Sequence, residues 1–216
     1  MERLRLYYPC RPHRTTQDWG DNQACVINFG EKNQHVTGKK GGVCPSGYEE
    51  LYPLFGMRGH NGLDLLAGVQ PIHASCAGTV IEVQTAPARG LGIGILTDEK
   101  YDFGKFGQMY AKLRYWHLKE IHVKVGQKVK VGDIIGISNS TGYSSGNHLH
   151  YELQLFNKDE GGHPMQFIHP DMIAGSIDPA PYWTGMHADD YHKAISYTQM
   201  LINALAALVA ELKKPR

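Results

Sequence analysis

The chain has 216 residues, of which 42% are hydrophobic, and its formal net charge at pH 7 is +1. This composition is sufficient for one globular domain with a proper core, plus extensions. The near-zero charge excludes the strongly basic surface that proteins use to hold nucleic acid, so we expect no nucleic-acid partner.

The N-terminal segment, residues 1–58, is punctuated by glycine and proline and predicts an irregular extension with one short strand at residues 24–29. Its start has neither an apolar stretch of signal-peptide length nor a small-residue cleavage site, so we expect no export signal. We expect the extension to pack on the following domain and to wall its groove. One of its side chains is a candidate inhibitory ligand, and deleting its start would then raise activity.

Four cysteines occur without a CxxC motif, and the sequence cannot choose among their pairings. Cys76 lies in a strand-like stretch and is expected to be a buried free thiol. A Cys25–Cys44 bridge is one alternative for the N-terminal loops, and a second metal site from Cys10, His13 and Cys25 is a weaker one.

The middle of the chain, from about Gly59 to Gln154, is rich in strand patterns. Between residues 123 and 136, VKVGQKVKVGDIIG predicts two short strands in a hairpin-like arrangement, broken by Gly126 and Gly132. The remaining predicted strands cover residues 78–85, 92–99, 112–118 and 148–156, the last being the final clear strand.

After a proline-rich linker, the period changes and predicts an amphipathic helix from Asp189 to Lys214. Ile195, Ile202 and Val209 are seven residues apart, and this stripe either docks on the same chain or pairs with a second copy through residues 190–214. The uncharged run within the helix has 17 residues and includes polar ones, so we expect no membrane span.

Three short motifs concentrate the residues that carry chemistry: GHNGLD at 59–64, YWHL at 115–118 and HLH at 148–150. Because HLH lies in a predicted strand, His148 and His150 project from the same face. Histidine nitrogen combined with an aspartate oxygen suits Zn²⁺ better than Ca²⁺ or Mg²⁺. Three protein ligands with two histidines to spare fit a catalytic zinc site, which keeps one position open.

These motifs, in this order, resemble the M23 family of zinc metallopeptidases, the lysostaphin and LytM type of peptidoglycan endopeptidase. The resemblance covers residues 59–155 and includes PIHASCAGTV, VKVGQKVKVGDIIGISNSTG and SSGNHLHYE, while TTQDWG at 15–20 resembles the usual entry to that domain. It implies a mainly β fold, a mostly antiparallel sheet with a groove over the metal. The implied domains are an N-terminal extension at 1–58, a peptidase domain at 59–180, and a linker with the C-terminal helix at 181–216.

Position by position, the resemblance makes His60, Asp64 and His150 the ligands of one zinc ion per chain, and His117 and His148 the catalytic pair. The implied activity is zinc-dependent endopeptidase cleavage of peptidoglycan stem peptides or cross-bridges by an activated water. The division of labour between the two catalytic histidines stays open. Because ligation and base action need neutral imidazoles, activity should fall below about pH 6.

The loop entering the last predicted strand offers Tyr143, Ser144 and Asn147 as substrate-binding residues, although a Gly/Ser-rich turn accounts for them equally well. Tyr115 is either a packed aromatic or a groove residue.

A non-catalytic alternative is a zinc-bearing module of the same fold that activates or docks a cell-wall or phage-tail partner. Without an export signal, the expected route is cytoplasmic synthesis and release to the wall, as for a phage or prophage lysin, or carriage in a virion.

Overall fold

The computed structural model describes residues 2–12, 14–21 and 59–212, with side chains described as far as Ala210. The strand expected at 24–29, the Cys25–Cys44 bridge and the Cys10–His13–Cys25 site depend on residues outside this part of the chain. Cys10 and Cys76 are buried free thiols, as expected for Cys76, and burial raises the pKa of Cys76 to about 12.

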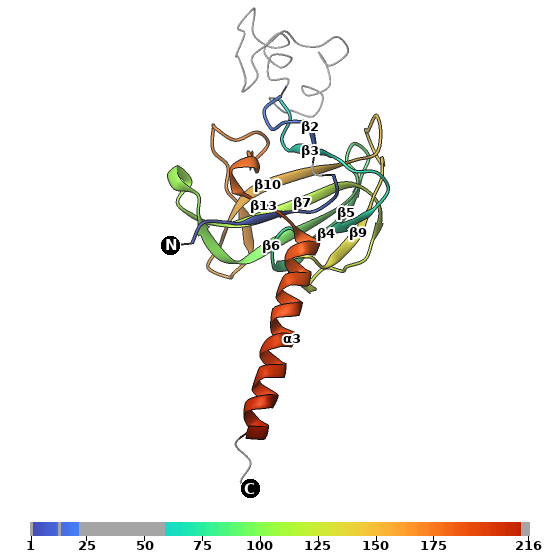
Figure 1. The fold of residues 1–216 in the computed structure, drawn as a ribbon. Helices are drawn as coiled ribbons and strands as arrows, with labels where there is room; N and C mark the ends of the chain where they lie inside the picture. Colours follow the sequence, from blue (N-terminus) through green and yellow to red (C-terminus); the bar gives the residue numbers. More distant parts are fainter. Residues whose placement is uncertain (1, 13, 22–58, 213–216) are drawn as a thin grey trace, which may run out of the picture.

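The described chain forms a β domain followed by one long helix (Figure 1). The helix is α3 (Ala188–Leu212), and short 3-10 turns lie at Gly104–Phe106 and Ala180–Tyr182. The strands are β1 (Leu6–Tyr8), β2 (Thr15–Gln17), β3 (Leu63–Leu66), β4 (Pro71–His73), β5 (Gly78–Ala86), β6 (Gly90–Asp102), β7 (Gln108–Ile121), β8 (Lys128–Val129), β9 (Ile134–Ser138), β10 (His148–Lys158), β11 (Pro164–Gln166), β12 (Ser176–Ile177) and β13 (Trp183–His187).

The main sheet has the strand order β2-β3-β10-β7-β6-β5-β8, and every pairing in it is antiparallel. The prediction of a mainly β, mostly antiparallel fold is confirmed. Alternation places Tyr151, Leu153 and Leu155 of β10 in the apolar core, together with Leu113 and Tyr115 of β7. The core therefore lies under the centre of the sheet and fixes β7 and β10 side by side.

Two strand predictions need correction. β8 and β9 both form, but they do not pair with each other, because β8 joins β5 and β9 joins β4 and β7. β10 is not the final strand either, since β11 and β12 pair with β10, and β13 pairs in parallel with β1. These strands have only two to five residues, too few for a periodic pattern to stand out.

The described part of the N-terminal extension is more regular than its glycine and proline content suggested. β1 pairs with β13, close to the start of α3, and β2 pairs with β3 at the edge of the main sheet. In the described residues 2–12 and 14–21, this backbone pairing joins the chain to the domain, and packing of the whole extension stays a prediction. The domain boundary at 58 stays a prediction.

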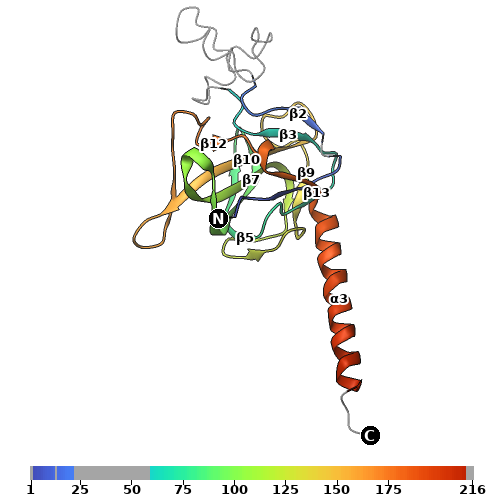
Figure 2. The same cartoon turned by 60° about the vertical axis from the view of Figure 1, so that its left-hand side comes forward.

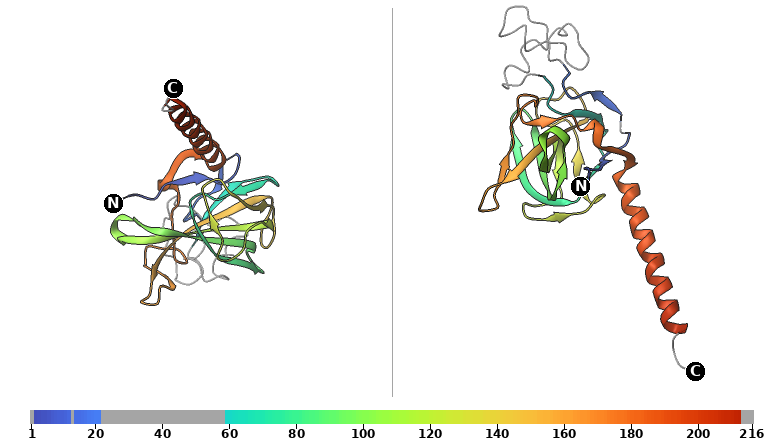
Figure 3. Two further views of the ribbon diagram at one scale, coloured as in Figure 1. Left: turned by 90° about the horizontal axis from the view of Figure 1, so that it is seen from below. Right: turned by 90° about the vertical axis from the view of Figure 1, so that its left-hand side faces the viewer.

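Helix α3 leaves the domain after its first turns (Figures 1 and 2). The Tyr191 ring packs 4.2 Å from the Tyr7 ring, Asp190 pairs with Arg11 at 2.5 Å, and His192 donates to the Val131 carbonyl at 3.0 Å. Every residue from Lys193 to Ala210 is exposed, and views from two further directions show the helix projecting clear of the sheet (Figure 3). Docking along the domain is therefore wrong for this stretch, whereas pairing with a second copy stays a prediction.

The expectation of no membrane span also needs qualification. That expectation considered the uncharged run alone, whereas the helix segment Ala188–Ala210 is long and apolar enough to cross a membrane by length and composition alone.

Candidate functional site

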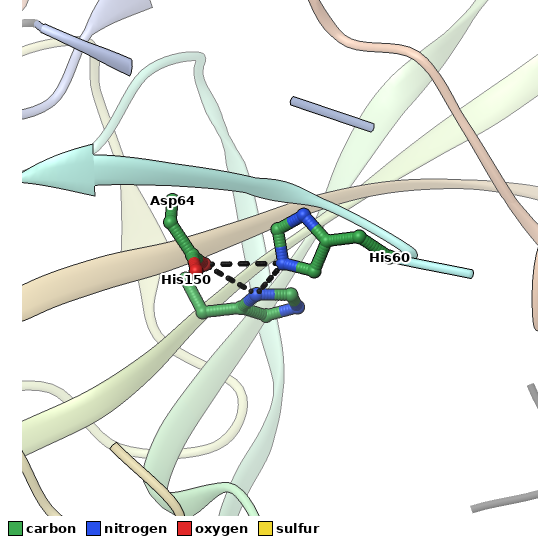
Figure 4. A group of neighbouring side chains, drawn as sticks. All are labelled: His60, Asp64 and His150. Carbon is green, nitrogen blue, oxygen red and sulfur yellow. Dashed lines mark hydrogen bonds and ion pairs between the residues drawn. The ribbon is translucent and has the colours of Figure 1, made fainter. Parts of the chain in front are cut away.

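Three side chains converge where β3 meets β10 (Figure 4). His60 Nε2 lies 3.0 Å from His150 Nδ1, and Asp64 Oδ1 lies 3.2 Å from His60 Nε2 and 2.9 Å from His150 Nδ1. The three atoms form a small triangle of two nitrogens and one oxygen. His60 and His150 are buried and Asp64 is nearly so, and the triangle is thus shielded from most of the solvent.

Strand register brings these residues together. Asp64 lies directly opposite His150 in the antiparallel β3–β10 pair, so both side chains lie on the same face. His60 precedes β3, and Gly62 lets the intervening backbone run close to β10. A Cβ at residue 62 would lie 2.6 Å from the Tyr151 carbonyl oxygen and 2.8 Å from the His150 ring. Glycine is therefore required at residue 62, and His60 and Asp64 come together at the start of a strand and not on a helix.

The triangle fits a metal site of the zinc type. Ligand atoms about 2.0–2.1 Å from a tetrahedral ion are about 3.3 Å from one another. The three separations in this chain, 2.9, 3.0 and 3.2 Å, are close to that spacing without any rearrangement of the backbone. Two imidazoles and one carboxylate are also a donor set that zinc accepts, and they leave a fourth position for water.

Further contacts orient the two imidazoles. His60 Nδ1 donates to the Asp18 carbonyl at 3.0 Å, and His150 Nε2 lies 3.4 Å from Glu152 Oε1. Once His150 has lost its second proton, a proton on each of these outer nitrogens would leave His60 Nε2 and His150 Nδ1 as the ligand atoms, as metal ligation requires. Asp18 belongs to the N-terminal segment, and that segment therefore helps to build the site.

Glu152 is a fully buried carboxylate held by a charged network. Arg114 donates to Glu152 Oε2 at 3.1 Å and to Glu82 Oε1 at 2.9 Å, and Gln154 also donates to Glu152 Oε2 at 3.1 Å. Alternation along β10 places Glu152 on the same face as His150, two residues away. The network keeps a negative charge behind the His150 ring.

His117 reaches the site through an unusual backbone conformation. Its neighbour Trp116 lies opposite His150, so regular alternation would direct His117 to the other face. Its φ of 64° breaks the alternation, and the ring comes 4.6 Å from the His148 ring and 6.0 Å from the His150 ring. His117 Nδ1 donates to the Thr141 carbonyl at 2.6 Å, which leaves Nε2 as a proton acceptor.

His148, the first residue of β10, also lies close to Asp64. Its Nδ1 donates to the Gly146 carbonyl at 2.8 Å and lies 3.1 Å from Ser144 Oγ, while Nε2 lies 3.6 Å from Asp64 Oδ1. As in His117, the contact at Nδ1 leaves Nε2 free to accept a proton near the triangle.

The surroundings shift the pKa values of His117 and His150 in opposite directions. Burial lowers the pKa of His117 to about 4, and the charge of His150 acts in the same direction. Burial also lowers the pKa of His150, but contacts with Asp64 and Glu152 outweigh it and raise this pKa to about 9. Burial raises the pKa of Asp64, yet His60 and His150 hold it well below its usual value. Asp64 is therefore ionised and His117 neutral across the physiological range.

The structure gathers all five predicted metal and catalytic residues within one cluster, although their roles stay predictions. Ser144 touches His148, whereas Tyr143 and Asn147 are exposed on the same loop. Tyr115 is a packed aromatic, because it is fully buried and accepts a hydrogen bond from the Ser75 backbone.

The sequence reasoning missed Glu152, Arg114 and the Asp18 and Thr141 carbonyls. The period of two in HLHYE was a usable signal for Glu152; backbone carbonyls carry no signal of residue type.

Comparison with known proteins adds an independent observation. Residues 58–164 match Peptidase family M23. Lysostaphin of Staphylococcus simulans is 33% identical over 149 residues, which are 65% of this chain and 28% of lysostaphin. Peptidoglycan DD-endopeptidase ShyA of Vibrio cholerae is 39% identical over 95 residues, 44% of this chain and 20% of ShyA.

Glycyl-glycine endopeptidase ALE-1 of Staphylococcus capitis is 37% identical over 123 residues, 54% of this chain and 31% of ALE-1. The matched part thus spans less than a third of each of these three relatives. Among solved structures, the lysostaphin catalytic domain from S. simulans covers 57% of this chain at 29% identity, over 78% of that domain, with a TM-score of 0.44.

Proposed function

Because residues 58–164 make this chain a member of peptidase family M23, we propose that it is a zinc-dependent endopeptidase that cleaves peptide bonds in peptidoglycan. The observation that carries the proposal is the triangle of His60, Asp64 and His150 with two further imidazoles, His117 and His148, beside it. A closed structural zinc site has four protein ligands and needs no such acceptors.

Zinc bound by the triangle would lower the pKa of a water molecule and polarise the scissile carbonyl. The chain's own contribution is proton handling at two fixed atoms, His117 Nε2 and His148 Nε2. Both rings are held at Nδ1 by backbone carbonyls, so each presents an unprotonated Nε2 toward the reacting peptide. One accepts the proton of the attacking water, and the other steadies the developing oxyanion after protonation or helps the amine to leave.

The next step is to ask which peptide bond of peptidoglycan is cleaved. Relatives are named for glycyl-glycine and for peptidoglycan DD-endopeptidase activities, which act on different bonds. We favour direct cross-links between stem peptides. Tyr143 and Asn147, exposed on the loop that leads into β10, are then the candidate contacts for a peptide lying over the triangle.

The test combines metal content with turbidity loss of purified walls, from one species with glycine bridges and one with direct cross-links. Wild type should carry one zinc and clear the second wall type. His150→Ala should lose both zinc and clearing, and His148→Ala should keep zinc without clearing. Stoichiometric zinc with no cleavage of either wall would refute the hydrolase and favour a zinc-bearing module that docks or activates a partner.

A further inference from the structure

The exposed part of α3 presents an apolar surface that the β domain leaves uncovered. Its large apolar side chains are between 42% and 63% exposed. They are Ile195, Tyr197, Met200, Leu201, Ile202, Leu205, Leu208 and Val209. Eight such side chains on one exposed helix are not the scattered hydrophobic residues that an ordinary surface carries, so this surface needs an occupant.

The breadth of this surface argues against a second copy of the helix. At about 100° per residue, the eight side chains spread over roughly 220° of the helix circumference, far wider than the seam of a two-stranded coiled coil. Pairing through Ile195, Ile202 and Val209 would leave Met200, Leu208 and their neighbours in water. The run from 194 to 210 also contains no charged residue to specify a partner helix. A helix that is apolar over most of its surface is typical of a lipid environment.

The length and the polar groups fit that environment. Because Tyr191 and His192 contact the β domain, the stretch that can enter a bilayer is Lys193–Ala210. It rises about 27 Å at about 1.5 Å per residue and lies at the short end of the range of about 17–25 residues that cross a hydrocarbon layer. Polar side chains within the run bond inside the helix: Thr198 donates to the Ala194 carbonyl at 2.9 Å, and Gln199 donates to Asn203 at 2.9 Å. They therefore place few unsatisfied donors in an apolar layer.

Charges flank the run at both ends. Lys193 precedes it and pairs with Asp189 at 2.7 Å, while Lys213, Lys214 and Arg216 follow the helix in the sequence. Lysine and arginine at the ends of an apolar helix can extend their charged groups toward lipid phosphates. In the sequence, cations therefore lie on both sides of the run, with Glu211 as the one acidic residue on its C-terminal side.

From the width of the apolar surface of α3, its length, the hydrogen bonds of its polar side chains and the charges that flank it, we propose that α3 crosses a lipid bilayer. The β domain is then held beside the membrane. This proposal does not rest on the peptidase activity, because none of its residues belongs to the site. The contacts of Tyr191 and His192 with the domain join the membrane segment firmly to the sheet.

Flotation of the full chain with vesicles of phosphatidylethanolamine and phosphatidylglycerol tests the proposal. Wild type should float with the vesicles and stay bound through high-salt and alkaline washes. Leu205→Lys combined with Leu208→Lys should reduce the bound fraction at least about 100-fold, because each lysine opposes insertion. The same lysines would strengthen mere adsorption to an anionic surface, so the direction of the change separates the two modes.

Val69→Lys combined with Val125→Lys is the matched control, since these valines are 54% and 60% exposed on the β domain and the added charge is the same. This variant should float like wild type, and equal zinc content in all three proteins would show intact domains. Wild-type protein that fails to float overturns the proposal, and light scattering at twice the chain mass would then identify a second copy as the occupant. Flotation that salt abolishes, or that the helix lysines leave intact, overturns it as well.

Discussion

Strand β10 and helix α3 are both long and largely apolar, but they differ in what covers them. Residues 149–156 of β10 are all buried, whereas Lys193 to Ala210 of α3 are all exposed. In β10, core residues such as Leu149 and Tyr151 alternate with His148, His150 and Glu152, so one segment serves both folding and chemistry. The exposed part of α3 contributes neither to the core nor to the site. Its apolar side chains are therefore suited to contact something outside the domain.

The largest expected effects concern the imidazoles of β10. His150→Ala removes one of the three ligands that we propose and should abolish both stoichiometric zinc binding and wall hydrolysis. His148→Ala should keep zinc but slow hydrolysis by about 10²–10⁴-fold, the usual contribution of a proton-transfer group. Metal analysis and initial rates on purified walls measure both. A His148→Ala enzyme at wild-type rate would remove this residue from the mechanism, and the α3 variant Leu205→Ala serves as control.

The charge behind His150 makes metal affinity dependent on pH. Since the folded pKa is raised, protonated His150 stabilises the apoprotein fully below pH 6.5, and this contribution disappears as pH rises through about 9. Zinc needs the neutral ring, so its apparent affinity should rise more than about 100-fold over the same window. Competition with a chromophoric chelator across this range gives the affinity. A flat profile would show that Asp64 and Glu152 do not hold a proton on His150.

Within β10, Glu152→Gln isolates the positioning role of that carboxylate. It removes the charge 3.4 Å from His150 Nε2 and, measured above about pH 9 where His150 is already neutral, should weaken zinc binding about 10–100-fold, as for other groups that orient metal ligands. Glu82→Gln is the matched control, because Glu82 pairs with the same Arg114 but does not face His150. Equal losses in the two variants would mean that Arg114 placement, rather than the His150 contact, matters.

Stability should separate the two regions directly. Leu153→Ala empties a fully buried position of β10 and should cost about 2–5 kcal/mol of the free energy of unfolding. Leu205→Ala makes the same chemical change on exposed α3 and should cost less than about 0.5 kcal/mol. Urea denaturation of both proteins without lipid gives the two values. A large cost at Leu205 would show that α3 is covered in solution, by a second copy or by the domain.

The smallest expected effect tests the backbone at residue 117. Because φ is 64° at His117, His117→Gly should be more stable than His117→Ala by about 1 kcal/mol, the reverse of the usual order away from left-handed positions. Urea denaturation midpoints of the two variants, analysed with the same dependence of the unfolding free energy on urea concentration, give the difference in stability. Equal stability would mean that the loop around Thr141 relaxes when the ring is removed.

The long strands could be predicted because period-two alternation is a local signal, whereas the five clustered residues were assigned together because three short motifs resemble the M23 pattern. The location of His117 was not open to the same reasoning, since alternation from Trp116 directs it to the other face. Strands β1 and β13 were not predicted, because a parallel pair between chain segments about 180 residues apart produces no pattern in the local sequence. The helix was found, but its exposure depends on the contacts it lacks, which no stripe of leucines reveals.

The left-handed backbone at His117 has a consequence for anyone who would engineer this chain. A library selected for heat resistance alone would favour glycine there, since glycine adopts this conformation without strain. Each variant selected in this way would have lost one of the two proton acceptors that we propose. Screens for robustness and screens for activity should therefore diverge first at this single position, and a thermostable variant is best built with residue 117 held fixed.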